Sequence, residues 1–399
     1  MSIWYSPHPK AFLREICMVL ATEKEHCAVS VPQYLLSSFR DELISYGRKS
    51  LGKLRIPQID PQSSLEQNLC PLFIFPYGDE ANIAALPEAT LSECRTLVIF
   101  LPETPLPWED EFFTFVDHMV AYAKFCKDQD IHMPWSLLLV VPAGRRMPRE
   151  DIGLSVFHWW GRLHVSDLEY AIERALGAAE TEEKHLYYWF YALCKGLASS
   201  DPGLVDFFLE ELPTDMDSLV NALSQHELHT RENGQLVLSY LNAPPCHLDR
   251  YAPPQGIVAT LWHRGILDIN CYGRTALHPA ALLAAGQTAE LERLAVSGQM
   301  QVFLPLAQEI HSLLYRKIEQ ILGPGWDSLN AENFPALDSE IGPLSYYIYT
   351  HYKSQLPIFL INTAKHWRDL RNNIAHANMI PFEEALQAVR DYLYLLEDQ

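Results

Sequence analysis

Short apolar runs alternate with helical patterns over residues 1–177. Runs with the length of buried strands lie at 28–31, 72–75, 96–101 and 136–141, and a shorter one lies at 54–56. Between them, apolar residues recur at helical spacing over 10–20, 34–46 and 109–126. Apolar strands separated by amphipathic helices are typical of a parallel sheet that helices cover. The pattern therefore predicts an N-terminal α/β domain.

The middle of the chain, residues 178–290, has a helical pattern throughout. The expected helices are 183–198, 204–212, 216–228 and 256–262. Residues 268–281 look like the start of an ankyrin repeat, but no second copy follows at a spacing of about 33 residues, and one ankyrin unit cannot bury its own apolar face. We therefore expect a turn and a short helix there, within a connector or partner-binding module.

The last part, residues 291–399, has the clearest helical spacing. A long amphipathic helix is expected over 303–322, ending at Gly323. Further helices are predicted at 344–352, at 358–374 and from Pro381, a residue suited to a first helical turn, to about 393. Helices with short connections pack against one another, so this part is predicted to form a compact helical bundle.

Composition and charge narrow the class of protein. The 399 residues are 48% hydrophobic, which is enough for several domains with cores. The formal net charge of -20 argues against a surface that binds nucleic acid everywhere, but it allows a local basic site. Eight scattered cysteines without a Cys-x-x-Cys pair are typical of reduced thiols. With no leader-like or membrane-spanning run, we expect a cytoplasmic protein that does not engage a membrane.

A nucleotide-binding site would be recognisable in the turn after the first predicted strand. A P-loop needs glycines, so that backbone amides can approach phosphates, and a lysine that reaches them. Residues 31–38 contain neither glycine nor lysine, and no Gly-x-Gly-x-x-Gly follows another strand. The domain therefore resembles P-loop ATPase or flavodoxin-like architectures in layout only. We interpret it as a degenerate α/β domain for sensing or docking.

Two features follow the predicted sheet. Trp159 and Trp160 are adjacent and flanked by histidines, so they could stack on a ligand or base, but core packing is the favoured interpretation. Ser166 is predicted as the N-cap of a helix over 167–176.

Near the C-terminus, one stretch combines residues that suit RNA chemistry. Arg371 is followed directly by the polar Asn372 and, five positions on, by His376, inside a helical pattern. This Arg-x4-His element in a helical bundle resembles the HEPN superfamily, whose catalytic members are metal-independent ribonucleases of toxin and anti-phage systems. The resemblance covers about the last quarter of the chain, and it implies a ribonuclease that needs no cofactor and acts as a dimer.

The residue types fit that chemistry. When a ribose 2′-hydroxyl attacks the adjacent phosphate, the enzyme needs a proton acceptor that titrates near neutrality, for which His376 is suited. It also needs a fixed positive charge for the phosphorane, which Arg371 supplies. In an ideal helix Asn372 and His376 share a face, whereas Arg371 and His376 lie about 140° apart. We therefore predict a homodimer through the C-terminal domain, with a shared cleft.

A local basic island surrounds this element. Residues 351–376 hold four lysines and arginines, namely Lys353, Lys365, Arg368 and Arg371, and one acidic residue, Asp369. RNA is expected to bind there, with Lys365, Arg368 and Asn373 as contact residues.

The leading hypothesis is an endoribonuclease effector of a prokaryotic anti-phage defence or toxin system that leaves a 2′,3′-cyclic phosphate. Its expected domains are an α/β domain over 1–177, a helical connector over 178–290 and a HEPN-like domain over 291–399. An ATPase, a sensor or an antitoxin protein is a possible partner. The alternative is a non-catalytic adaptor of a multiprotein defence complex, and a third hypothesis, an ATPase, is weakened by the missing P-loop.

Overall fold

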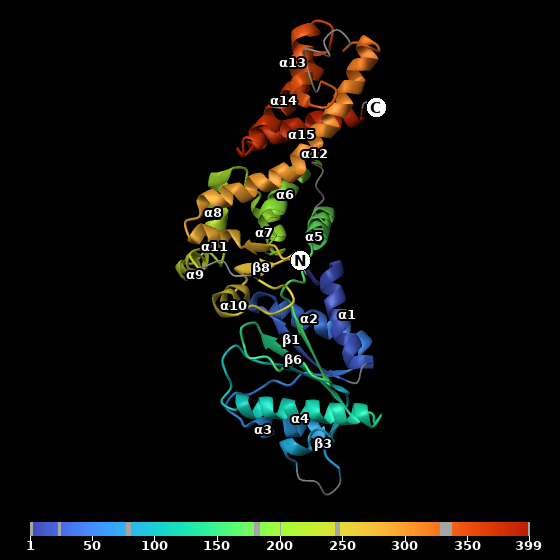
Figure 1. Ribbon diagram of the computed structural model, residues 1–399, viewed down its shortest axis with the longest axis vertical. Helices are drawn as coiled ribbons and strands as arrows, with labels where there is room; N and C mark the ends of the chain where they lie inside the picture. The colour runs from blue at the N-terminus through green and yellow to red at the C-terminus, as the bar shows by residue number, and fades with distance from the viewer. Residues whose placement is uncertain are drawn as a thin grey trace. The chain divides into compact units, whose positions relative to one another are not determined.

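The computed structural model describes residues 3–22, 25–76, 81–178, 184–199, 201–243, 248–327 and 337–397 (Figure 1). The chain divides into two compact units. Residues 2–167 and 239–277 form an α/β unit, and residues 168–238 and 278–399 form a helical unit. The division into three domains that the sequence suggests stays a prediction.

The α/β unit is built on a parallel sheet. Among the described residues the sheet has five strands, in the order β2-β5-β6-β1-β7. They are β1 (His26–Val31), β2 (Leu54–Arg55), β5 (Thr96–Phe100), β6 (Ser136–Pro142) and β7 (Leu154–His158). The predicted parallel α/β sheet is confirmed. Because β1 lies between β6 and β7, the strand order differs from the flavodoxin-like order 2-1-3-4-5, and that alternative is excluded.

One predicted strand belongs elsewhere. The run at 72–75 contributes β3 (Phe73–Ile74), which pairs antiparallel with β4 (Thr90–Leu91), outside the parallel sheet. Prolines at 71 and 76 bracket this run, and proline cannot donate to a ladder, which keeps the run short and out of a central position. The edge beside β1 is instead occupied by β7, whose residues after Leu154 are only half-buried.

Helices cover both faces of the sheet (Figure 1). The main ones are α1 (Pro7–Thr22), α2 (Gln33–Ser50) and α4 (Glu109–Asp128). Ala28, Leu97 and Leu139 pack with residues of α4, including Phe112 and Met119, on one face. The remaining elements of this unit are η1 (Ile3–Tyr5), α3 (Leu65–Leu69), η2 (Cys70–Leu72), η3 (Ile83–Ala85), α10 (Gly256–His263), β8 (Leu267–Ile269) and β9 (Thr275–Leu277).

The tryptophan pair is confirmed as core. Trp159 packs its ring 4.8 Å from that of Trp4, and Trp160 packs 5.5 Å from Trp262, with both members of the pair buried. The proposed Ser166 cap is wrong, because the helix α5 (Val165–Ala178) already includes that residue. The reason is that Asp167 reaches back to the N–H of His164 and caps the helix from its first turn.

The other helices lie wholly or mostly in the helical unit. They are α5, α6 (Lys184–Leu197), α7 (Leu204–Glu211), α8 (Met216–Ser224), α9 (Arg231–Leu241), α11 (Pro279–Ala284), α12 (Thr288–Leu322), α13 (Ile341–His351), α14 (Ile358–Ala375) and α15 (Phe382–Glu397). The helix α12 begins at Thr288, earlier than the start expected at 303. The prediction began too late because the buried but polar Gln299 interrupts the apolar spacing. Its side-chain oxygen accepts the Ile380 N–H at 2.9 Å, so the buried amide is satisfied.

The residues that look like an ankyrin repeat form an antiparallel pair, β8 with β9, followed by the short helix α11. The expectation of a turn and a short helix is confirmed, with a two-stranded hairpin in addition. Among the described residues, no helix combines the length and apolar character needed to cross a membrane.

Two glycines allow α6 and α12 to cross closely. A Cβ at Gly196 in α6 would lie 2.3 Å from the Leu294 carbonyl oxygen, and one at Gly298 in α12 would lie 2.1 Å from that of Ala192. Both clashes are with backbone atoms, which cannot rotate away. The two helices can pack this closely only because neither position carries a side chain.

Candidate functional site

The C-terminal candidate lies on α14, one side of which is buried. The buried side chains form an apolar stripe: Leu360, Ile361, Ala364, Trp367, Leu370 and Ile374. The Trp367 indole N–H also donates to the carbonyl of Ala388 in α15, 2.9 Å away. Burial of this stripe leaves the polar residues in the last turns of α14 at the surface.

Arg371 is half-exposed and has two polar contacts. One guanidinium nitrogen donates to Asn372 Oδ1 at 3.3 Å, and the other lies 3.2 Å from Glu340 Oε2, just before α13. The side chain of Arg371 is 39% exposed and that of Glu340 is 50% exposed, so solvent screens this pair. A phosphate that binds Arg371 therefore competes with Glu340.

His376 stands at the end of α14 as its C-cap. Its backbone N–H donates to the Asn372 carbonyl at 3.0 Å, and the next residue, Ala377, has a φ of 57° that turns the chain away. The side chain is exposed. Within the described residues, Arg371 and His376 make no hydrogen bond with each other, so the structure brings them to one helix end without joining them.

The three predicted RNA-contact residues differ in their surroundings. Lys365 is exposed. Arg368 donates twice to Asp369 Oδ1, at 2.9 and 2.7 Å, and Asn373 donates to Glu384 Oε2 at 3.5 Å. Acidic neighbours therefore already engage Arg368 and Asn373.

A second histidine, His366 on α14, was not predicted as part of the site. Among the described residues, its side chain contacts a carboxylate, which that of His376 does not. His366 Nδ1 lies 2.9 Å from Asp391 Oδ2 in α15, whose other oxygen accepts from Gln387 Nε2 at 2.9 Å. The imidazole is 42% exposed, whereas the carboxylate is 7% exposed. If Nδ1 carries the proton shared with this carboxylate, Nε2 is left as an acceptor.

The sequence offers a signal for one half of this pair. Asp391 occupies the apolar side of α15, next to the buried Tyr392 and three residues after the buried Ala388. A carboxylate at a core position needs a partner. Which residue supplies that partner could not be derived, because His366 belongs to another helix and its position depends on how the two pack.

In the α/β unit, the turn where a P-loop would lie is a single residue. β1 ends at Val31 and α2 begins at Gln33, so only Pro32 connects them, with φ -69° and ψ 154°. Proline has no N–H to offer a phosphate. One residue further on, the Tyr34 hydroxyl donates to Asp268 Oδ2 at 3.4 Å.

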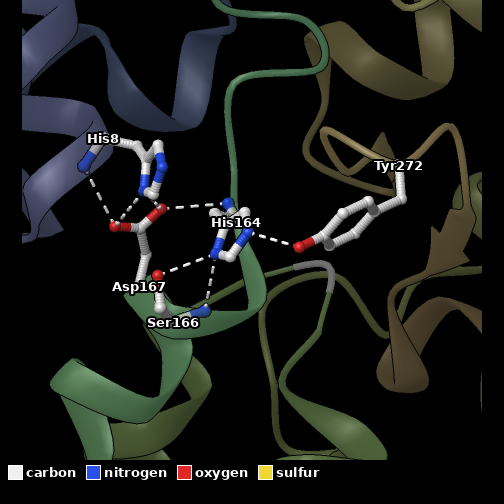
Figure 2. Close-up of polar contacts among 5 residues, drawn as sticks. All are labelled: His8, His164, Ser166, Asp167 and Tyr272. Atoms are coloured by element: carbon white, nitrogen blue, oxygen red, sulfur yellow. Dashed lines mark hydrogen bonds and ion pairs between the residues drawn. The ribbon is translucent and has the colours of Figure 1, made fainter.

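A polar cluster in the same unit surrounds Asp167, as Figure 2 shows. The carboxylate is fully buried and accepts the backbone N–H of His8 at 3.1 Å and that of His164 at 2.9 Å. The His8 ring Nδ1 lies 3.2 Å from it. The two imidazole rings stack with their centres 4.6 Å apart, and His164 Nε2 lies 2.6 Å from the Tyr272 hydroxyl.

These contacts favour a structural role for the cluster. Asp167 satisfies amides at the starts of α1 and α5, where helices have unpaired N–H groups and a positive dipole end. The His164 Nδ1 accepts from the N–H of Ser166 at 3.1 Å, so the ring is held on both sides. These hydrogen bonds account for the burial of the Asp167 carboxylate.

Comparisons with known proteins do not identify the chain. No protein-family description matches it, and no curated protein matches it. Among solved structures, it is similar to the RuvB Holliday junction branch migration motor of Thermotoga maritima, at 13% sequence identity and a TM-score of 0.34. The similarity covers 71% of this chain and 95% of that one. This likeness is too slight to assign an activity.

Proposed function

We propose that this protein is a metal-independent endoribonuclease of a prokaryotic anti-phage defence or toxin system, with its site at the end of α14. The observation that carries the proposal is the placement of Arg371 and His376. Both stand at one helix end, accessible to solvent, on a helix whose opposite face is anchored in the bundle. The HEPN-like Arg-x4-His pattern supports the same assignment.

The proposed reaction uses these side chains directly. His376 takes the proton of a ribose 2′-hydroxyl, and the oxygen attacks the adjacent phosphorus. The new bond to O2′ forms as the bond to the 5′-oxygen of the next nucleotide breaks. That oxygen takes a proton from an imidazolium or from water, and a 2′,3′-cyclic phosphate remains. Arg371 stabilises the charge on the phosphorane.

A homodimer fits the proposal better than a single chain. Arg371 and His376 of one chain make no hydrogen bond with each other within the described residues, and Arg371 pairs with Glu340. Two copies of the helix end placed side by side would let the arginine of one approach the histidine of the other. RNA binding would then exchange Glu340 for phosphate at Arg371.

The test is RNA cleavage by the full chain and by His376→Ala. We expect the variant to lose cleavage by about 10²-fold or more, because general-base catalysis commonly contributes that much. Cleavage should persist in EDTA, and products should carry cyclic phosphate ends. His118→Ala, an exposed histidine on α4, is the matched control. Equal cleavage by His376→Ala, or cleavage only with magnesium, would overturn the proposal.

The second candidate is a non-catalytic adaptor that dimerises through the C-terminal bundle. The contacts of Arg371 with Asn372 and Glu340 favour the adaptor, because they engage the guanidinium group that catalysis would need. Mass determination in solution beside the RNase assay separates the two. The adaptor would be supported by a dimer that does not cleave RNA, even after addition of a protein encoded by a neighbouring gene, such as an ATPase, sensor or antitoxin.

A further inference from the structure

The helices α13 and α14 carry a surface that is unusual for this chain. Residues 341–368 contain no Asp or Glu, although 50 of the 399 residues are acidic. The same stretch contains Lys353, Lys365 and Arg368. In a protein of net charge -20, this stretch has three positive side chains and no negative side chain of its own, which favours an anionic ligand.

Two tyrosines on α13 are exposed side by side. Tyr346 is 58% exposed and Tyr349 is 53% exposed, and they are three residues apart, which places them on one helical face. The opposite face of α13 is buried through Leu344, Tyr347 and Ile348. Tyr346 and Tyr349 therefore lie on the face of α13 that is exposed.

Lys353 contacts the second of these tyrosines. Lys353 Nζ lies 4.4 Å from the centre of the Tyr349 ring and donates to its hydroxyl at 3.2 Å. This hydrogen bond and the charges of Lys353 and Lys365 lower the pKa of Tyr349. Lys365 is exposed on α14, which packs against α13, and within the described residues it forms no ion pair.

The surface continues toward Arg371. Glu340, just before α13, pairs with Arg371 near the end of α14, and a short connection joins the end of α13 at His351 to the start of α14 at Ile358. The two helices therefore run antiparallel and pack against each other. The residues Tyr346, Tyr349, Lys353 and Lys365, which we call the tyrosine–lysine track, lead to the helix end that carries Arg371 and His376.

We propose that the tyrosine–lysine track binds single-stranded RNA, with bases stacked on Tyr346 and Tyr349 and phosphates held by Lys353 and Lys365. Unpaired bases offer flat faces to aromatic rings, whereas bases in a duplex are already stacked. Lys353 and Lys365, which form no ion pair within the described residues, suit phosphates of any sequence. The inference rests on the proposed function and names the form of its substrate as unpaired RNA.

The experiment measures binding of a fluorescent single-stranded oligoribonucleotide and of the corresponding duplex to the full chain. His376→Ala is the background, so that RNA stays intact during the measurement. We expect tighter binding of the single strand, and about tenfold weaker binding after Tyr346→Ala or Tyr349→Ala, because stacking on one aromatic ring contributes about that factor. Lys353→Gln should weaken binding and lower its salt dependence.

Tyr251→Ala is the matched control, since Tyr251 is exposed and has Arg250 4.4 Å from its ring centre, but lies in the other unit. Circular dichroism checks that each variant is folded. Equal affinity for the duplex, no affinity for RNA, or unchanged affinity in both tyrosine variants would overturn the inference. So would a tyrosine variant that only turns a dimer into monomers, which would make the track an interface between copies.

These results can be told apart from failure of the proposed function. If the track binds single-stranded RNA but the chain with His376 intact never cuts it, the nuclease assignment fails and the binding surface stands. If the chain cuts RNA and the tyrosine variants bind and cut as before, the nuclease assignment stands and the track is wrong.

Discussion

His366 Nδ1 lies 2.9 Å from Asp391 Oδ2, so α14 and α15 are joined by a histidine–carboxylate pair of which mainly the imidazole is accessible. Two histidines of α14 could thus serve as a base: His366, oriented by a carboxylate, and His376, at the helix end. The proposed function assigns the reaction to His376. The pair at His366 is then a structural contact between the two helices.

This assignment can be tested by substituting each histidine. His366→Asn is expected to lower the free energy of unfolding by about 1 kcal/mol, because a half-exposed partner of Asp391 is lost. Its cleavage rate should fall less than about tenfold, against about 10²-fold or more for His376→Ala. Initial rates and denaturant unfolding measure both effects. The opposite order of rates would move the base to His366.

Glu340 is expected to restrain Arg371. Glu340→Gln removes the charge 3.2 Å from the guanidinium, so RNA affinity should rise a few-fold while stability changes by less than about 0.5 kcal/mol, since the pair is exposed. Fluorescence anisotropy with labelled RNA measures the affinity. Glu290→Gln is the control, because it breaks a comparable exposed pair with Arg293. If RNA affinity rises equally in both variants, the cause is the lower net negative charge of the protein and not the release of Arg371.

Asp167 is expected to be the most sensitive polar position of the α/β unit. Asp167→Asn replaces a buried carboxylate that accepts from two helix starts by a group with one acceptor oxygen, and should cost about 2–4 kcal/mol of stability. Tyr272→Phe, which removes only the hydroxyl facing His164, should cost about 1 kcal/mol or less. Denaturant unfolding followed by tryptophan fluorescence compares the two. Similar losses would contradict the central role of Asp167.

His26 is expected to make the α/β unit less stable in mild acid. Burial lowers its pKa from 6.5 to about 4, although a hydrogen bond to the Met119 carbonyl and the charge of Glu25 oppose the shift. Between these values the unfolded chain binds a proton that the folded chain does not, so stability falls as pH falls. At about pH 5 the loss is on the order of 2 kcal/mol relative to about pH 7.5.

The measurement for His26 is the difference in unfolding free energy between the natural chain and His26→Gln at those two pH values. Glutamine can both donate and accept, as His26 does with Met119 and with the Leu137 N–H, but it does not titrate. The difference should shrink by about 2 kcal/mol at the lower pH. If the difference in unfolding free energy is the same at both pH values, protonation of His26 does not cause the loss of stability in acid.

The sequence was most informative where burial follows a simple period. The apolar stripe of α14 and the strands β1, β5 and β6 follow helical spacing or continuous burial, and all were predicted. The strand β7 was missed because its half-buried residues at the sheet edge lack such a run. The antiparallel pairing of β3 was missed because pairing depends on a distant segment, β4.

The candidate site was predictable only in part. Arg371, Asn372 and His376 could be found because they are close in sequence and on one helix. The contacts of Arg371 with Glu340 and of His366 with Asp391 could not, since each joins two helices whose packing is a tertiary property. Likewise, the exposure of Tyr346 and Tyr349 depends on which face of α13 the bundle covers.

The crossing of α6 and α12 has a consequence for recognising relatives of this protein. Because a methyl group at Gly196 or Gly298 would overlap a carbonyl oxygen, any chain that keeps this crossing must keep glycine at both places, whatever else has diverged. The interval between them contains α7 to α11 and part of the α/β unit, so the two glycines are far apart in the sequence. Two glycines so placed, ahead of an Arg-Asn-x-x-x-His helix end, therefore form a signature by which distant homologues can be sought.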